Sequence, residues 1–414
     1  MTDNNVLAPA IIPSIQRIVN PGEAITFTAR ANGSSDPAGI RDALDRARHW
    51  VFARGSSLTI NGLEGQFTET SPIVVDQDNA SHIILAGTSI TMASSGGAVQ
   101  VASITKIATL KYDVVLQWFT SGLTSGVIVG NFIKIRAYAA STTGSGALRV
   151  RDLSGIWPIT VVNSASKLVT IRVNLVKDLD ALDTITIALT NIRVIRTVLQ
   201  GSFTYNATRQ GLFDVHSGIQ LSGMCLYGGK TDTGTPSTGG PTADGVADTA
   251  GVVIRENAFF RALDHVGSYG WDYGVSNEGG EMYANDFAAC FNANNAFYGQ
   301  FGAVFKCFYA TASGSNVGCA MFSGSLFTGT NAVFAGNTTN ARSGDSSNIA
   351  LDDDAWISAG VVGFNVADNG VITAAGADLT TTAGIAMGNT TLHTVTRYGR
   401  VMYDDAGTPV NATS

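Results

Sequence analysis

Carboxylate and aromatic side chains alternate between residues 264 and 286 of this sequence. The window contains Asp264, Tyr269, Trp271, Asp272, Tyr273, Glu278, Glu281 and Asp286. Hydrolysis of a glycosidic bond uses two carboxyl groups, one as an acid and the other as a base or nucleophile. Aromatic rings beside such acids offer a flat apolar surface for the C–H face of a sugar. The pattern is therefore typical of a site that binds or cleaves a glycan.

This chemistry selects candidate residues within the window. The catalytic candidates are Asp272, Glu278 and Glu281, and the glycan-binding candidates are Tyr269, Trp271 and Tyr273. Two other interpretations of the same residues stay open. One is a surface that contacts a receptor without cleaving it, and the other is a set of solvated acids at turns.

No second group of residues in the sequence indicates catalysis or a cofactor. The acidic run Asp352–Asp354 has the oxygen ligands that Ca²⁺ prefers, but consecutive strand residues point to opposite faces, which favours a solvated turn. His265 follows Asp264 and is a potential base, although a single histidine at a turn is more often only hydrogen-bonded. Arg255 and Arg261 lack the aspartate cluster that a Ca²⁺-dependent lyase needs. We therefore predict no metal and no cofactor.

The composition favours many short strands joined by tight turns. The 414 residues are 45% hydrophobic and only 14% charged, with 47 glycines and 9 prolines. The net charge of -7 provides no basic face, so we predict no nucleic-acid partner. The cysteines lack the spacing of metal sites and are predicted to be buried free thiols. They are Cys225, Cys290, Cys307 and Cys319.

No apolar run approaches the ~20 residues that span a bilayer, so we predict no membrane insertion. The N-terminal stretch MTDNNVLAPA lacks the basic and apolar regions of a signal peptide. Synthesis in a cytosol, without secretion by that route, is the expectation.

The stretch from Asp36 to Gly87 predicts a helix followed by short strands. Asp36 and Pro37 suit the first positions of a helix, and Gly55 suits its end. The apolar stripe of this helix is Ile40, Leu44, Ala47 and Val51. Three short apolar runs follow, separated by turn residues: Leu58–Ile60, Ile73–Val75 and His82–Leu85.

This stretch resembles the start of the pectate-lyase-like β-helices found in tailspike and fibre proteins of tailed bacteriophages. The matching positions are Ile40, Ala43, Leu44, Ala47, Gly55, Leu58, Ile60, Gly65, Phe67, Ile73, Val75, Ile83, Leu85 and Gly87. The resemblance implies an all-β chain, a right-handed parallel β-helix solenoid with an N-terminal capping helix and an inserted antiparallel β-domain. It also implies a homotrimer that attaches to other virion proteins through its N-terminal segment.

Changes in pattern along the chain divide it into segments. We expect an N-terminal attachment or leader segment (1–35), a capping helix with the first β-helix coils (36–103), an inserted antiparallel β-domain (104–200), the main β-helix (201–370) and a C-terminal β-cap or tip (371–414). In the insert, Ile159–Val162 and Leu168–Val173 flank a polar turn and predict a hairpin. Val129–Ile135 resembles a strand of the tailspike insert, with Asn131 where an acid is usual.

In the main β-helix, two sets of residues recur at roughly solenoid spacing. The phenylalanines predicted to stack inside the cylinder are Phe259, Phe287, Phe305 and Phe327. The asparagines predicted to form a polar ladder at turns are Asn257, Asn285 and Asn331.

The resemblance implies a virion protein that recognises polysaccharide on the host surface during adsorption. A depolymerase of the tailspike type, acting as a glycoside hydrolase or lyase, is the first alternative. A purely structural virion appendage, such as a head fibre, is the second. The expected partners are other copies of this chain, other virion proteins and a host-surface glycan.

Overall fold

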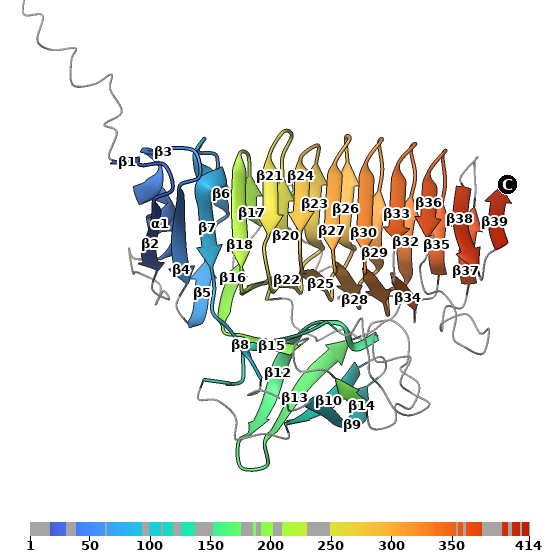
Figure 1. Ribbon diagram of the computed structural model, residues 1–414. Helices are drawn as coiled ribbons and strands as arrows, with labels where there is room; N and C mark the ends of the chain where they lie inside the picture. The colour runs from blue at the N-terminus through green and yellow to red at the C-terminus, as the bar shows by residue number, and fades with distance from the viewer. Residues whose placement is uncertain are drawn as a thin grey trace, which may run out of the picture.

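The computed structural model describes residues 17–29, 39–62, 64–92, 99–108, 111–118, 126–136, 152–174, 185–187, 192–201, 209–229, 249–352, 355–358, 362–374, 391–395, 400–405 and 408–413. The regular secondary structure of these residues is almost entirely β-strand, arranged as three long parallel sheets and one antiparallel sheet (Figure 1). A small parallel pair, β1 (Arg17–Val19) with β3 (Trp50–Phe52), lies at the N-terminal end.

We call the first parallel sheet sheet 1. It consists of β2 (Ala24–Ala29), β4 (Ser57–Gly62), β7 (Ile83–Ala86), β18 (Gly218–Ser222), β21 (Phe259–Ala262), β24 (Glu281–Ala284), β27 (Val304–Phe308), β30 (Leu326–Thr330), β33 (Asn348–Asp352), β36 (Val371–Ala374), β38 (Arg400–Asp405) and β39 (Thr408–Thr413). Strand β39 pairs antiparallel with β38 and ends the sheet. Strand β2, which falls in the expected leader segment, pairs parallel with β4.

The other two parallel sheets we call sheet 2 and sheet 3. Sheet 2 consists of β5 (Gly65–Glu69), β16 (Thr197–Gly201), β19 (Met224–Tyr227), β22 (Val266–Tyr269), β25 (Phe287–Cys290), β28 (Thr311–Ser313), β31 (Val333–Ala335) and β34 (Trp356–Ser358). Sheet 3 consists of β6 (Ile73–Val75), β17 (Gln210–Val215), β20 (Thr249–Ile254), β23 (Tyr273–Glu278), β26 (Asn295–Gln300), β29 (Val317–Met321), β32 (Thr339–Ser343), β35 (Val362–Val366) and β37 (Thr391–Val395).

The chain visits the three sheets in turn, so each sheet takes every third strand of the main body. From β18 to β35, a strand of sheet 1 is followed by one of sheet 2 and then one of sheet 3. From β21 to β36, paired residues of sheet 1 are 22 or 23 positions apart, as in the series Phe259, Glu281, Val304, Leu326, Asn348 and Val371. This order is consistent with a parallel β-helix whose coils stack along one axis.

The interior of the coils is filled by apolar side chains in register. Phe305 pairs with Phe327 in sheet 1, and Val275 pairs with Phe297 in sheet 3. Phe297 lies 5.7 Å from Phe327 between ring centroids, which joins the two sheets across the core. The predicted stack is correct for Phe305 and Phe327 and wrong for Phe259, whereas Phe287 is buried inside the coils as predicted but does not stand in line with the other two. Successive strand residues face opposite sides of a sheet, so Phe260 points inward in place of Phe259, and Phe287 belongs to sheet 2.

The expected asparagine ladder does not form, because its members lie at different corners. Asn257 follows β20 and precedes β21, whereas Asn285 and Asn331 lie between strands of sheets 1 and 2. A buried polar ladder forms instead at the corner between sheets 2 and 3. Its hydrogen bonds run from Asn292 N to Ser315 Oγ (3.1 Å) and from Ser315 N to Asn337 Oδ1 (2.9 Å). These side chains bond from one coil to the next at a buried turn.

The helix α1 (Ile40–Ala47) covers the N-terminal end of the coils (Figure 1). Its buried face is Ile40, Ala43, Leu44 and Ala47. The prediction that the helix continues to Val51 is wrong. Asn79 Nδ2 donates to the carbonyls of Ala47 (2.8 Å) and Trp50 (2.7 Å). These hydrogen bonds cap the C-terminal end of the helix. Val51 lies in β3 and is half exposed.

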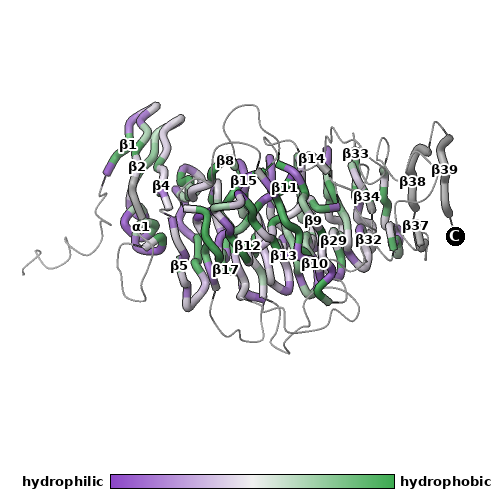
Figure 2. Tube along the Cα trace, turned by 90° about the horizontal axis from the view of Figure 1, so that it is seen from below, coloured by the Kyte–Doolittle hydropathy of each residue, from purple (hydrophilic) through white to green (hydrophobic). Residues whose placement is uncertain are grey.

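The antiparallel sheet lies against the outer face of sheet 2 (Figures 1 and 2). It consists of β8 (Ser89–Thr91), β9 (Val99–Ala108), β10 (Lys111–Trp118), β11 (Phe132–Ile135), β12 (Gly155–Asn163), β13 (Leu168–Asn174), β14 (Ile185–Ile187) and β15 (Ile192–Ile195). The hairpin predicted around residues 163–166 is confirmed, because β12 and β13 pair antiparallel there. In the chain, this sheet separates β7 from β16.

A buried ion pair joins the antiparallel sheet to the parallel coils. Lys134 Nζ lies 2.8 Å from Asp286 Oδ1 and donates to the carbonyls of Val266 and Asp286. His265 Nδ1 lies 3.0 Å from Asp286 Oδ2. Burial alone raises the pKa of Asp286, but the charge of Lys134 and the hydrogen bonds from His265 and Lys134 outweigh it, so this pKa lies well below its ordinary value.

Candidate functional site

The structure distributes the residues of the 264–286 window over three environments. Trp271 and Asp272 lie at the corner between β22 and β23 and are almost fully buried. Trp271 Nε1 donates to the carbonyl of Leu226 (3.0 Å). The Asp272 carboxylate accepts hydrogen bonds from Thr249 N (2.9 Å) and Thr249 Oγ1 (2.7 Å). Neither side chain presents a face to a polysaccharide in this conformation.

Tyr269 lies between the parallel coils and the antiparallel sheet. Its ring is 5.5 Å from Phe132 and 6.4 Å from Trp157 between centroids, and both belong to the antiparallel sheet. Asn174 Nδ2 donates to its hydroxyl (2.9 Å). With 4% of the side chain exposed, Tyr269 has the contacts of an interface residue rather than a sugar platform.

Tyr273 and Glu278 belong to the outer side of sheet 3, in a network of arginines. Arg255 donates to Glu278 (2.6 Å) and to Asp214 (2.7 Å), and the Arg209 guanidinium lies 4.1 Å from the centroid of Tyr273. These ion pairs engage the carboxylate of Glu278. Glu281 begins β24 in sheet 1 and is exposed. The three candidate carboxylates, those of Asp272, Glu278 and Glu281, therefore have separate surroundings. Their catalytic role stays a prediction.

The metal and thiol predictions concern other regions. Asp353 and Asp354 of the acidic run lie outside the described residues. Among the described residues, no cluster of three or more His, Cys, Asp or Glu side chains is placed to hold a metal ion. The four cysteines are buried and free, as predicted. Burial raises the pKa of Cys290 to about 12, so the thiol is protonated at neutral pH.

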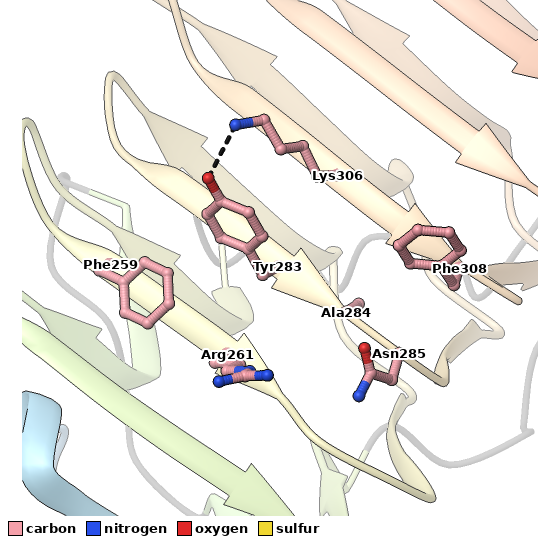
Figure 3. Close-up of a pocket in the computed structure, with 7 residues that line it drawn as sticks. All are labelled: Phe259, Arg261, Tyr283, Ala284, Asn285, Lys306 and Phe308. Atoms are coloured by element: carbon pink, nitrogen blue, oxygen red, sulfur yellow. Dashed lines mark hydrogen bonds between the residues drawn. The ribbon is translucent and has the colours of Figure 1, made fainter. Parts of the chain in front are cut away.

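The outer face of sheet 1 carries a groove across three consecutive coils, with a volume of about 400 Å³ (Figure 3). It is lined by Phe259, Arg261, Tyr283, Ala284, Asn285, Lys306 and Phe308. Strands β21, β24 and β27 supply most of these residues, and neighbouring strands lie roughly 4.8 Å apart. Arg261, Tyr283 and Lys306 are cross-strand partners, so their side chains form one row on the outer face.

Aromatic rings and hydrogen-bond donors alternate within this groove. Phe259 and Tyr283 have ring centroids 5.4 Å apart. Lys306 Nζ donates to Tyr283 Oη (2.7 Å) and lies 4.8 Å from the centre of the same ring (Figure 3). That hydrogen bond raises the pKa of Lys306, which is therefore charged at neutral pH. Phe308 is 52% exposed at the far side of the groove.

The 264–286 window missed most of this groove because its residues come from three coils. Only the repeat distance could have found them from the sequence. Arg261, Tyr283 and Lys306 follow one another at the same 22- and 23-residue intervals as Phe259, Glu281 and Val304. Aligning the chain at that period places the aromatic and cationic residues in adjacent rows.

Comparisons with known proteins give only weak structural similarity. No family model and no curated protein matches the chain. Among solved structures, a complex of XylC with xylose is 8% identical, with a TM-score of 0.28, and the match covers 94% of this chain and 73% of that one. The tailspike of Pseudomonas phage phi297 is 10% identical, with a TM-score of 0.22 and coverages of 90% and 68%. A glycoside hydrolase is 10% identical, with a TM-score of 0.26 and coverages of 86% and 85%.

These structural neighbours thus include a phage tailspike and a glycoside hydrolase, at similarities too low to carry an argument. Within the described part of the chain, no helix has the length and hydrophobicity to cross a membrane.

Proposed function

We propose that this chain is a tailspike or tail-fibre protein of a phage virion that recognises a host-surface polysaccharide through the sheet-1 groove. In this proposal the body is a right-handed, pectate-lyase-like parallel β-helix, which agrees with the strand order and with the right-handed rule for connections between parallel strands. The working form is a homotrimer, attached to other virion proteins through the N-terminal segment.

The observation that carries the proposal is the groove on sheet 1. It combines two aromatic rings in contact, Phe259 and Tyr283, with the donors of Arg261, Asn285 and Lys306. Sugars present apolar C–H faces between rows of hydroxyl groups, and this arrangement complements both features. The groove crosses successive coils, so it suits an extended polymer rather than a compact small molecule. Three copies on one fibre would convert weak single contacts into strong binding through multivalency.

The test is retention of the purified protein on an array of bacterial surface polysaccharides. We expect saturable binding to at least one polymer by the wild type, and at least a tenfold loss in Tyr283→Ala. Phe301→Ala is the matched control, because Phe301 is 68% exposed and does not line the groove. Equal binding by wild type and Tyr283→Ala would remove the groove from the proposal.

The same samples separate recognition from cleavage when reducing ends are followed over time. Intact polymer with saturable binding supports a recognition fibre. Chain shortening that disappears in Glu281→Gln would instead support the depolymerase alternative, since Glu281 is an exposed carboxylate on β24, one of the groove strands. Neither binding nor shortening across the array would favour a structural appendage.

A further inference from the structure

The charged side chains that line the groove are opposite in sign to the chain as a whole, although the exposed Glu281 lies on the same strand as Tyr283. The full sequence has a net charge of -7, yet the groove lining contains the cations Arg261 and Lys306 and no acid. A neutral polysaccharide would need only hydroxyl-binding groups and rings. Two cations in an otherwise acidic chain indicate that the groove takes a ligand that carries negative charge.

The two cations, Arg261 and Lys306, differ in whether their side chains have a partner within the protein. Lys306 Nζ is bound to Tyr283 Oη, and the exposed Glu281 also contributes to its raised pKa. The side chain of Arg261 is exposed and has neither a hydrogen bond nor an ion pair with any described residue. Lys306 therefore orients the tyrosine ring, while the Arg261 guanidinium is available to a ligand.

We infer that the sheet-1 groove selects an acidic glycan, and that Arg261 binds the carboxylate of a uronic-acid-type sugar whose ring packs on Tyr283. The planar guanidinium binds a carboxylate through two parallel hydrogen bonds, which a hydroxyl group of an uncharged sugar cannot match. Arg261 and Tyr283 are cross-strand partners, so the carboxylate contact and the ring contact fall on neighbouring coils. This inference rests on the proposed glycan-binding function and specifies its ligand.

The experiment compares two probes that differ only in charge. One is a short oligomannuronate, and the other is the same oligomer after chemical reduction of its carboxyl groups to alcohols. Affinities are measured by titration calorimetry for the wild type, Arg261→Gln, Arg261→Lys and Arg342→Gln. Arg342 is the matched control, since it is an exposed arginine over the ring of Phe322 on sheet 3.

We expect the wild type and Arg342→Gln to bind the acidic oligomer at least tenfold more tightly than the reduced one. Arg261→Gln should lose this preference while it binds the reduced oligomer like the wild type, and Arg261→Lys should retain part of it. The preference should weaken as salt rises, because the site is exposed.

Equal affinity of the wild type for the two oligomers would overturn the acidic specificity and leave the proposed function standing. A preference that persists in Arg261→Gln would overturn the role of Arg261. Absence of binding to either oligomer would also overturn the inference. In that case the polysaccharide array decides the proposed function separately, through the dependence of binding on Tyr283.

Discussion

At the scale of single residues, Asp272 and Glu278 have partners that account for their presence without catalysis. Asp272 accepts two hydrogen bonds from Thr249 at a buried corner, and Glu278 accepts one from Arg255. In contrast, Arg261 and Phe308 on sheet 1 are exposed beside a groove. Polar groups that bond within the protein stabilise it, whereas exposed donors and rings are available to a ligand.

The corner role of Asp272 predicts a loss of stability on its removal. Asp272→Ala leaves Thr249 N and Oγ1 without their acceptor in a buried site, which costs roughly 1–3 kcal/mol of unfolding free energy. Urea unfolding followed by circular dichroism measures this loss. Glu281→Ala is the control at an exposed position and should change the free energy by less than about 0.5 kcal/mol. Equal stability of the two variants would contradict the corner role.

At the scale of elements, the antiparallel sheet is joined to the parallel coils by the buried Lys134–Asp286 pair. Lys134→Met removes one charge and leaves Asp286 with His265 and the more distant Arg136. Breaking a buried pair on one side costs roughly 3–5 kcal/mol, and the remaining partners place the expected loss near the lower end. Thermal and urea unfolding measure it. A variant as stable as the wild type would show that the pair does not hold the sheets together.

The same pair predicts a dependence of stability on acid pH. The folded-state pKa of Asp286 lies below its ordinary value of 3.8, so its contribution is complete above that pH and is lost as the pH falls below it. The difference in unfolding free energy between the wild type and Asp286→Asn should therefore become smaller as the pH falls below about 4. A difference that stays constant with pH in this range would contradict the assigned shift.

The stacked core predicts a large contrast between inner and outer phenylalanines. Phe297 contacts Phe287, Phe305, Phe327 and Phe334 inside the coils. Phe297→Ala should lower the free energy of unfolding by roughly 3–5 kcal/mol because it opens a cavity. The same substitution at exposed Phe301 should cost less than about 0.5 kcal/mol. Similar losses at both positions, measured by urea unfolding, would contradict the stacked core.

The sequence predicted those elements whose signals are local. The runs Leu58–Ile60 and Ile73–Val75 form strands as expected, because alternation and flanking turns are properties of a few neighbouring residues. The 163–166 hairpin followed from the same kind of signal. The end of α1 was missed, because the hydrogen bonds from Asn79 that capture it come from a residue far along the chain.

The candidate site was harder to predict, because strand register decides it. A shift of one position moves a side chain from the outer face to the core, as Phe259 and Phe260 show. Trp271 and Asp272 are close in sequence to Tyr273, yet a corner buries them. The groove residues Arg261, Tyr283 and Lys306 become neighbours only through coil-to-coil pairing, which a local window does not contain.

At the scale of the whole molecule, the proposed homotrimer predicts the mass of the particle in solution. The chain has a mass of 43.0 kDa, and the account predicts a particle three times as heavy in solution. Light scattering coupled to size-exclusion chromatography measures this mass without assuming a shape. A mass of one chain at working concentrations would contradict the trimer, although each groove would still be complete within one chain, since all its lining residues belong to the same copy.

The most direct test of the central claim is a crystal structure of the protein with an oligosaccharide from a polymer that it retains. The account predicts sugar density on the outer face of β21, β24 and β27, with a ring against Tyr283 and further contacts to Arg261 and Phe308. Density on another face, with the sheet-1 groove empty at a saturating oligosaccharide concentration, would contradict it.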